Sequence, residues 1–332
     1  MTQATRRLQF VLFAILAACA GVSVPGNGPH LLPSTKLAQS RLALPSELLY
    51  VAGGPTEEPH PFIEVFNAQD TSSSPQPIYT IPPIGGGSYF LLAVDATNDL
   101  FAINLTNRAK LLVFPSGKSV PSISCVLANT PQGIYIARNV LYLATALYTI
   151  EEYALPIHAG HKCPNPNATL TDQRAKLRGT LGLWAPVVDP HGDIFDIWFD
   201  GLGETIDEFP AGSKRARRFA PLPNTGGAYY LLSDSSGNLV TSIAGTGSQY
   251  DSIAMFPHGM HSPKRFHPIS NGSYLGFAIA EHGTELFAAR DYPTTEVQVY
   301  AYDSTTGNVG RLLRSFTDVW YYAQPIAVFS RK

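Results

Sequence analysis

The sequence is poor in charged residues and in methionine. Only 14% of its 332 residues are Asp, Glu, Lys or Arg, the formal net charge is −2, and methionine occurs 3 times. So small a charge creates no strong electrostatic field, which excludes bulk attraction to nucleic acid as a default function. Four common catalytic signatures are absent too: a phosphate-binding loop, a dinucleotide fingerprint after a strand, a Gly-x-Ser-x-Gly elbow and a His-Glu-x-x-His motif. None of these sequence motifs therefore indicates a particular reaction.

The N-terminal region has no hydrophobic run long enough to span a membrane. Its apolar stretch, residues 8–18, has 11 residues and is broken by Gln9. A transmembrane helix needs about 20 residues to cross a hydrocarbon core of about 30 Å. Arg6 and Arg7 precede the stretch and small residues follow it. This order predicts that residues 1–18 are an export signal peptide.

The end of this segment resembles the lipobox of bacterial lipoproteins. Residues 16–19 read Leu-Ala-Ala-Cys, and Ala20 follows. The resemblance implies cleavage before Cys19 and attachment of a diacylglycerol to its thiol; the alternative is an ordinary signal peptide cleaved nearby. Ala20, in place of Asp, resembles cargo sent to the outer membrane. Because residues 19–44 are rich in Gly and Pro, we expect a lipidated, flexible tether that leads to a folded domain over residues 45–332.

The few cysteines fit an exported protein. Beyond Cys19 only Cys125 and Cys163 remain, an even number for an oxidising compartment. A bond between them would close a loop of 38 residues. Two free thiols are the alternative, and the sequence alone leaves the choice open.

The folded region contains an internal repeat. Its 28 Gly, 27 Pro, 16 Tyr and 17 Phe favour short strands and tight turns. A pair of apolar residues recurs at intervals of 41 to 53 residues. Each pair is followed by a second strand, which ends in an aromatic residue 12 to 17 positions after the first residue of the pair. The pairs are Leu49-Tyr50, Leu100-Phe101, Leu141-Tyr142, Ile194-Phe195, Leu239-Val240 and Leu286-Phe287.

Each repeat is expected to form one four-stranded sheet. An acidic residue lies five positions before four of the pairs, as Asp95, Asp189, Asp234 and Glu281, and Asn139 lies in the corresponding turn of the third repeat. These side chains could be cation ligands, but turns use them to accept backbone hydrogen bonds, which is the reading we favour. A period of 40 to 50 residues is typical of a propeller blade. The sequence therefore predicts an all-β, six-bladed β-propeller.

The C-terminus is expected to close the ring. Residues 325–328, Pro-Ile-Ala-Val, repeat the first strand of the unit, and no second strand follows them. A last strand that completes the first blade would leave no sheet edge open. Residues 42–44, Leu-Ala-Leu, could compete for the same place.

The repeat resembles NHL-repeat propellers, whose units run roughly Gly-Ile-Ala-Val-Asp-x-x-Gly-Asn-Leu-Tyr-Val-Ala. The best copies are residues 187–196 and 231–241, and the resemblance covers residues 45–329. It implies the fold and leaves the function open, because propellers include binding modules and enzymes alike.

Aromatic residues stand where the chain enters successive blades, often beside glycine. If they point towards the channel, they would form a rim able to stack on a ligand. The alternative is ordinary packing between blades. The candidate ligand-binding residues are Tyr89, Trp184, Tyr229, Tyr274 and Tyr321.

Carboxylates are the weaker candidates for catalysis. A strand over residues 193–199 would put Asp196 and Trp198 on one face, with Asp200 and Glu204 in the next loop. They could be an acid and base pair or hold a divalent cation, although a solvated strand edge explains them as well. Gluconolactonase-like propellers use a Glu, an Asn and an Asp around one ion, and no such set maps onto this sequence.

Two histidine groups suit zinc or copper by residue type, but neither offers four ligands. They are His158, His161 and Cys163, and His258, His261 and His267. We therefore assign no metal site, no cofactor and no nucleic-acid partner from the sequence. The leading hypothesis is an exported, lipid-anchored module that binds a ligand or a protein at its loop face. The alternative is a propeller hydrolase or lyase, lactonase-like, with its site at the channel mouth.

Overall fold

The computed structural model describes residues 44–53, 62–72, 75–158, 160–178, 186–199, 204–222, 230–243, 252–263, 265–268, 274–280, 283–290, 296–317 and 326–330. The chain divides into two compact units, Met1–Ser46 and Glu47–Lys332, and every described strand belongs to the second. No helix among the described residues is long and apolar enough to cross a membrane.

The second unit is built almost entirely of short strands. The only described helix is α2 (Gln173–Arg178), between the third and fourth sheets. The strands of the first three sheets are β1 (Glu47–Gly53), β2 (Phe62–Asn67), β3 (Tyr79–Ile81), β4 (Ser88–Val94), β5 (Leu100–Leu105), β6 (Ala109–Phe114), β7 (Ile123–Val126), β8 (Pro131–Ala137), β9 (Val140–Thr145), β10 (Thr149–Ala154) and β11 (Ala168–Thr171). Those of the last three, with the C-terminal strand, are β12 (Val187–Val188), β13 (Ile194–Phe199), β14 (Glu204–Phe209), β15 (Arg217–Pro221), β16 (Leu231–Ser233), β17 (Leu239–Ile243), β18 (Ser252–Phe256), β19 (Arg265–Pro268), β20 (Tyr274–Ile279), β21 (Glu285–Arg290), β22 (Glu296–Asp303), β23 (Asn308–Thr317) and β24 (Ile326–Ser330).

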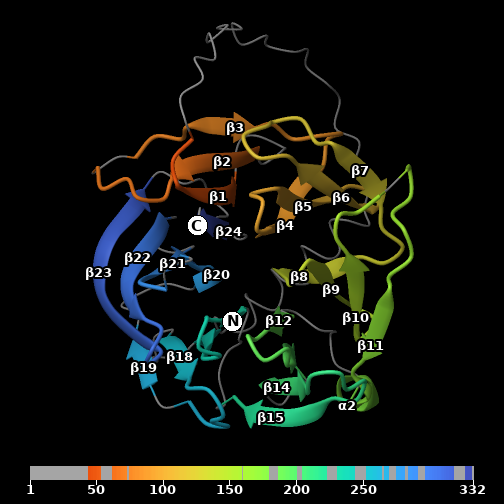
Figure 1. The fold of residues 1–332 in the computed structure, drawn as a ribbon, viewed down its shortest axis with the longest axis vertical. Coiled ribbons are helices and arrows are strands. Elements are labelled where there is room, and N and C mark those ends of the chain that lie inside the picture. Colours follow the sequence, from red (N-terminus) through yellow and green to blue (C-terminus); the bar gives the residue numbers. More distant parts are fainter. Residues whose placement is uncertain are drawn as a thin grey trace, which may run out of the picture. The chain divides into compact units, whose positions relative to one another are not determined.

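These strands form six antiparallel sheets of four strands, which confirms the predicted six-bladed β-propeller. Blade one is β24-β1-β2-β3, and blades two to six follow in chain order from β4 to β23. Figure 1 shows the first strands near the centre, such as β4, β8, β12 and β20, and the last strands, such as β7, β11 and β23, at the rim. Ile326–Ser330 supplies the innermost strand of blade one and pairs with Glu47–Val51, so the C-terminal strand closes the ring.

The repeat in the sequence corresponds to one register position in every blade. In each blade the first residue of the apolar pair lies directly opposite the aromatic residue of the next strand. The six cross-strand pairs are Leu49 with Phe66, Leu100 with Phe114, Leu141 with Tyr153, Ile194 with Phe209, Leu239 with Phe256 and Leu286 with Tyr300. All twelve are buried. The repeat therefore encodes the core of each blade.

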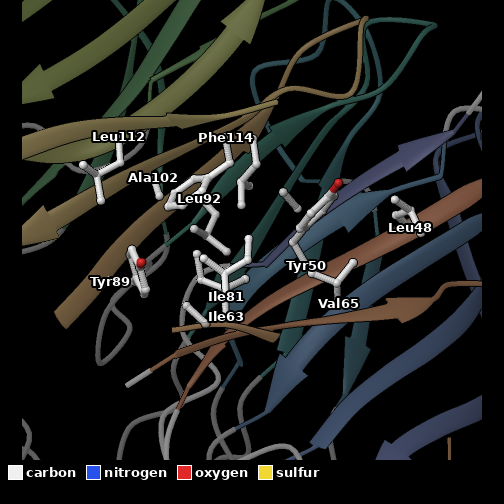
Figure 2. Packing of buried hydrophobic residues seen from close by; sticks show 13 residues of the cluster. Leu48, Tyr50, Ile63, Val65, Ile81, Tyr89, Leu92, Ala102, Leu112 and Phe114 are labelled. Atoms are coloured by element: carbon white, nitrogen blue, oxygen red, sulfur yellow. The ribbon is translucent and has the colours of Figure 1, made fainter. Parts of the chain in front are cut away.

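The core is divided among the blade interfaces. Six clusters of buried residues are found in the described part of the chain, each between two neighbouring blades, and the cluster between blades six and one completes the circle. Figure 2 shows the cluster between blades one and two, where Leu48 and Tyr50 of β1 lie in one core with Leu112 and Phe114 of β6. Since every blade buries both faces, hydrophobic burial holds the ring together around its whole circumference.

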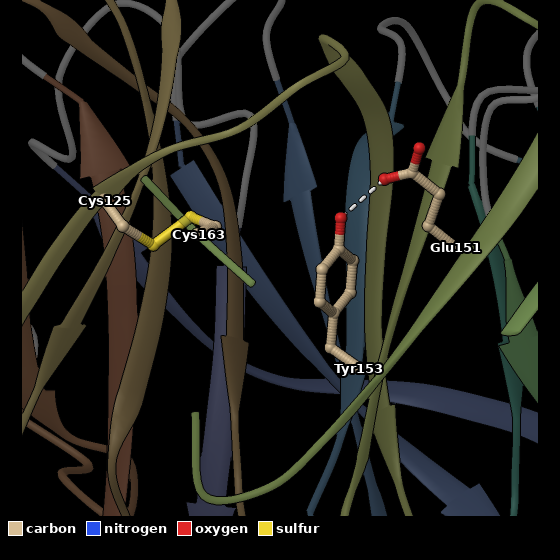
Figure 3. Close-up of a disulfide and its surroundings, with 4 residues drawn as sticks. All are labelled: Cys125, Glu151, Tyr153 and Cys163. Atoms are coloured by element: carbon tan, nitrogen blue, oxygen red, sulfur yellow. Dashed lines mark hydrogen bonds between the residues drawn. A yellow bond between two sulfur atoms is a disulfide. The ribbon is translucent and has the colours of Figure 1, made fainter. Parts of the chain in front are cut away.

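A disulfide joins blades two and three (Figure 3). Cys125 in β7 is bonded to Cys163 in the connection from β10 to β11, with an S–S distance of 1.99 Å. The same two segments exchange backbone hydrogen bonds, from the Val126 amide to the His161 carbonyl at 3.0 Å and from the Cys163 amide to the Val126 carbonyl at 3.1 Å. The outer strand of one blade is thus linked to the next blade both covalently and by its backbone.

The acidic residues before the apolar pairs organise turns. Oδ1 of Asp189 accepts hydrogen bonds from the amides of His191, Gly192 and Asp193 at 2.8–2.9 Å. Oδ1 of Asp95 and of Asp234 each accepts two amides in the corresponding turn. This is the turn chemistry favoured from the sequence; Glu281 lies outside the described residues.

Candidate functional site

A cavity of about 290 Å³ lies where the innermost strands meet at the axis of the ring. It is lined by residues of β4, β8, β16, β20 and β24, together with Pro186 before β12. Every blade thus contributes to its wall. A cavity at the axis is the first place to look for a ligand site.

The wall of this channel is largely aliphatic. Val94, Ile279 and Val328 occupy one register position in blades two, six and one, opposite Leu100, Leu286 and Leu49. Each is partly exposed and lines the cavity, and each also packs against a core cluster between its own blade and a neighbouring one. These three adjacent blades therefore present an arc of branched side chains at one level of the channel.

Asp234 is the one carboxylate among the described residues of the channel wall. Oδ1 accepts the amides of Ser236 and Asn238, and Oδ2 accepts the Asn238 side-chain amide and the Tyr302 hydroxyl, both at 2.7 Å. Burial, with the nearby charge of Asp234, raises the pKa of Tyr302, which therefore stays protonated and continues to donate. Because both oxygens are engaged, Asp234 serves the turn and has no free oxygen to offer as a general base.

Of the carboxylates considered for catalysis, Asp196 lies between blades three and four. Asp196 of β13 faces Asp207 of β14 across the sheet. Asp196 is buried from both solvent and the channel, since its exposed fraction is 0% and it does not line the cavity. Neither of its oxygens has a hydrogen-bond partner among the described residues. Ile194 and Trp198 on the same face join the cluster between blades three and four, so Asp196 and Trp198 share a face as predicted.

Burial dominates the electrostatics of this cluster. It raises the pKa of Asp196 well above 3.8, and the negative charges of Asp172 and Asp207 raise it further. The pKa of Asp207 is raised to about 6 by burial and by Asp172, although Arg174 donates to Oδ2 of Asp207 at 2.8 Å and opposes the shift. Asp172 caps α2 by accepting the amides of Arg174 and Ala175, and burial raises its pKa too. Arg174 therefore offsets part of the charge of Asp172 and Asp207.

The other two acidic candidates, Glu204 and Asp200, are not seen beside Asp172, Asp196 and Asp207. Glu204 begins β14 and is 6% exposed. It lies an odd number of positions from Asp207, so its side chain leaves the opposite face of the strand, the face where Ile206 packs against blade five. Asp200 lies outside the described residues.

The structure makes Tyr89 a core residue. Its exposed fraction is 5%, its hydroxyl donates to the Pro82 carbonyl at 2.8 Å, and its ring meets Phe114 edge to face at 6.3 Å (Figure 2). Packing between blades, the alternative considered for these aromatics, therefore describes this position. Trp184, Tyr229 and Tyr321 lie outside the described residues, as does the side chain of Tyr274.

Neither predicted histidine group brings three metal-ligating side chains together among the described residues. Cys163 is bonded to Cys125 and cannot ligate a metal with His158 and His161. Nδ1 of His261 lies 2.8 Å from the Phe219 carbonyl, while His258 stacks on His191 of the neighbouring blade. Among the described residues, Asp189, His191 and His258 alone bring three metal-ligating side chains together. No local sequence pattern connects His191 with His258, so the sequence alone does not indicate this group.

The fold is shared with very different proteins. TolB from Acinetobacter baumannii matches with a TM-score of 0.59 and 11% identity, over 86% of this chain and 67% of TolB. A chain of the nidogen/laminin complex matches with a TM-score of 0.57 and 12% identity over 85% and 97% of the two chains. Hydrazine synthase of Kuenenia stuttgartiensis matches with a TM-score of 0.54 and 11% identity over 74% and 71%.

No protein-family model matches the sequence, and neither does any curated protein. At 11–12% identity the structural matches show the propeller fold and nothing finer. The function has to be argued from the site.

Proposed function

We propose that the chain is an exported, lipid-anchored binding module that takes a small, largely apolar ligand in its axial channel or a protein partner at the channel mouth. The observation that carries this proposal is the chemistry of the cavity wall, which combines partly exposed aliphatic side chains with a carboxylate whose oxygens both accept hydrogen bonds. Such a wall favours binding over acid–base chemistry.

Burial of apolar surface supplies the affinity in this proposal. Removing apolar area from water stabilises a complex by about 25 cal/mol per Å² before the costs of association are subtracted. The volume of about 290 Å³ suits a small molecule. A protein partner would instead contact the loops around the mouth, several of which lie outside the described residues.

The test places polar groups on the aliphatic arc. The double variant Val94→Gln, Ile279→Gln makes the channel wall polar, and Val120→Gln is its control because Val120 is 73% exposed on a loop between β6 and β7. The amphipathic dye 1-anilinonaphthalene-8-sulfonate is the probe. We expect saturable dye fluorescence that falls at least about fivefold in the double variant, since each buried amide without a partner costs about 1–3 kcal/mol.

Equal dye binding by the double variant and the control would contradict binding in the channel. Circular dichroism melts of all three proteins show whether the ring is intact. If a partner protein binds the native protein and the double variant equally well, and the double variant also binds the dye normally, only the protein-binding form of the proposal is supported.

The alternative is a hydrolase or lyase of the lactonase-like kind, and one observation favours it. Asp196 is buried with a strongly raised pKa, a feature that often marks functional carboxylates. This alternative predicts a bound divalent ion that is lost on Asp196→Asn or Asp200→Asn, measured by elemental analysis of the purified protein. An ion content that both substitutions leave unchanged argues against it.

A further inference from the structure

Two turns from neighbouring blades meet on one side of the ring. The β12–β13 turn of blade four carries Asp189 and His191, and the β18–β19 turn of blade five carries His258. One possible ligand atom from each lies within 4.8 Å of the other two. The imidazole rings of His191 and His258 stack with their centroids 4.5 Å apart at an angle of 35°. Since antiparallel blades put both kinds of turn at the same end of the sheet, this is the end opposite the β13–β14 loop.

Asp189 has a carboxylate oxygen to offer. Oδ1 already accepts three backbone amides of its turn, whereas Oδ2 is buried and has no hydrogen-bond partner among the described residues. Only 3% of Asp189 is exposed, so water does not readily replace a partner. An unsatisfied buried acceptor destabilises the folded protein, more so when it is charged, and a cation at this oxygen would remove that penalty.

A glycine beside the cluster leaves room for the imidazole of His258. Gly237 has a φ of +80°, and a Cβ at this position would lie 2.8 Å from Nδ1 of His258. Any other residue here would be strained and would displace the ring. A cavity of about 130 Å³, lined by Asp189 and His258 with Glu208, Arg217 and His261, opens beside the cluster. Both His191 and His258 are exposed, so an ion can reach them from solvent.

The donor set selects the kind of metal. Two imidazole nitrogens and a carboxylate oxygen suit zinc and related divalent transition metals, whereas calcium and magnesium prefer oxygen ligands throughout. Zinc bonds of about 2.0–2.1 Å require donor atoms about 3.3 Å apart in tetrahedral geometry. The candidate ligand atoms lie within 4.8 Å of one another in this structure, so binding a metal ion requires the two exposed imidazoles to turn towards Asp189.

We infer that Asp189, His191 and His258 bind a divalent transition-metal ion of the zinc type between blades four and five. Three protein ligands leave a fourth position for water. Because the ligands come from two blades, the bound ion links the blades and stabilises the folded ring over the unfolded chain. The site is independent of the axial channel and of the proposed binding function.

The test titrates the metal-stripped full-length protein with zinc chloride by calorimetry, and with cobalt chloride by visible absorption. The variants are His191→Ala and His258→Ala, both at exposed positions, and Asp189→Asn, which keeps an oxygen to accept the turn amides. His158→Ala is the matched control, because His158 is an exposed histidine in blade three. We expect one zinc per chain in the native protein and the control, a loss of affinity of at least about tenfold in each ligand variant, and loss of the zinc-induced rise in melting temperature.

The inference is overturned if the native protein binds no zinc, or if the ligand variants bind it as tightly as the control does. It is also overturned if the ion persists in the histidine variants and disappears on Asp196→Asn, which would assign the metal to the carboxylate cluster between blades three and four. Far-UV circular dichroism of every variant separates loss of a ligand from loss of the fold.

Discussion

At the scale of single residues, the carboxylates divide by what satisfies their oxygens. Oδ1 of Asp95, Asp189 and Asp234 accepts hydrogen bonds from backbone amides of a turn, so these carboxylates stabilise the turns. Asp196 differs, because it is fully buried and neither oxygen has a partner among the described residues. Desolvation therefore sets its protonation state.

Asp196→Asn is expected to stabilise the protein at neutral pH. The pKa of Asp196 is raised in the folded state above its usual value of 3.8, so above pH 3.8 the folded state retains a proton that the unfolded state has lost. Stability therefore falls as pH rises through this interval, and Asn has no proton to lose. We expect the variant to melt at least about 2 °C higher than the native protein at pH 7.5, with a smaller difference at pH 3.5.

Thermal melts at both pH values check this. Asp70→Asn is the control, because Asp70 is partly exposed and its pKa is lowered by Ser72 hydrogen bonds, so its replacement should not stabilise the protein. A lower melting temperature of Asp196→Asn at pH 7.5 would mean that the ionised carboxylate has a favourable partner, such as a cation.

At the scale of strands and blades, β24 has a special role. It is the only described strand that joins a blade from the far end of the chain, and it covers the inner edge of β1 over Glu47–Val51. Its side chains enter both neighbouring interfaces, Ile326 towards blade six and Ala327 towards blade two. An uncovered β1 would expose unpaired backbone groups and two open cores.

A chain that ends at residue 325 is therefore expected to lose the closed ring. The truncation removes the five register pairs between β24 and β1 and opens the interface between blades six and one. We expect loss of the cooperative melting transition and aggregation on size-exclusion chromatography. A chain that ends at residue 330 retains β24 and serves as the control; if the shorter chain melts as the control does, closure by β24 is not what holds the ring.

At the scale of the whole molecule, export and anchoring remain a prediction from residues 1–19, which lie outside the described residues. Cys19→Ser should move the protein from the membrane fraction to the soluble fraction, because a serine hydroxyl cannot form the thioether to diacylglycerol. Ala20→Ser, which keeps the cysteine, should stay with the membranes. Immunoblots of the fractions check both, and unchanged fractionation of Cys19→Ser would contradict lipid anchoring.

The fold was predictable because each blade is encoded locally and then repeated. The apolar pair and the aromatic residue that follows it are separated by 12 to 17 residues, and they lie directly opposite each other in all six blades. Strand alternation also put Asp196 and Trp198 on one face. The closing strand is recognisable because residues 325–328 repeat a first strand; Leu-Ala-Leu at 42–44 is an alternative in the sequence, and the pairing of β24 with β1 decides for the C-terminal strand.

Only the tertiary structure shows which side chains meet between neighbouring blades. Tyr89 looked like part of a ligand rim and is packed against Phe114, while Asp196 looked like a solvated edge and is buried beside Asp172 and Asp207. His191 and His258 are 67 residues apart in the sequence, and stack because blades four and five are neighbours in the ring. Apart from the pairing of β24 with β1, the sequence determines each blade through strand pairs about 20 residues apart or fewer. Which groups meet between blades depends on the angle and spacing of the packed sheets, and no local sequence pattern encodes these.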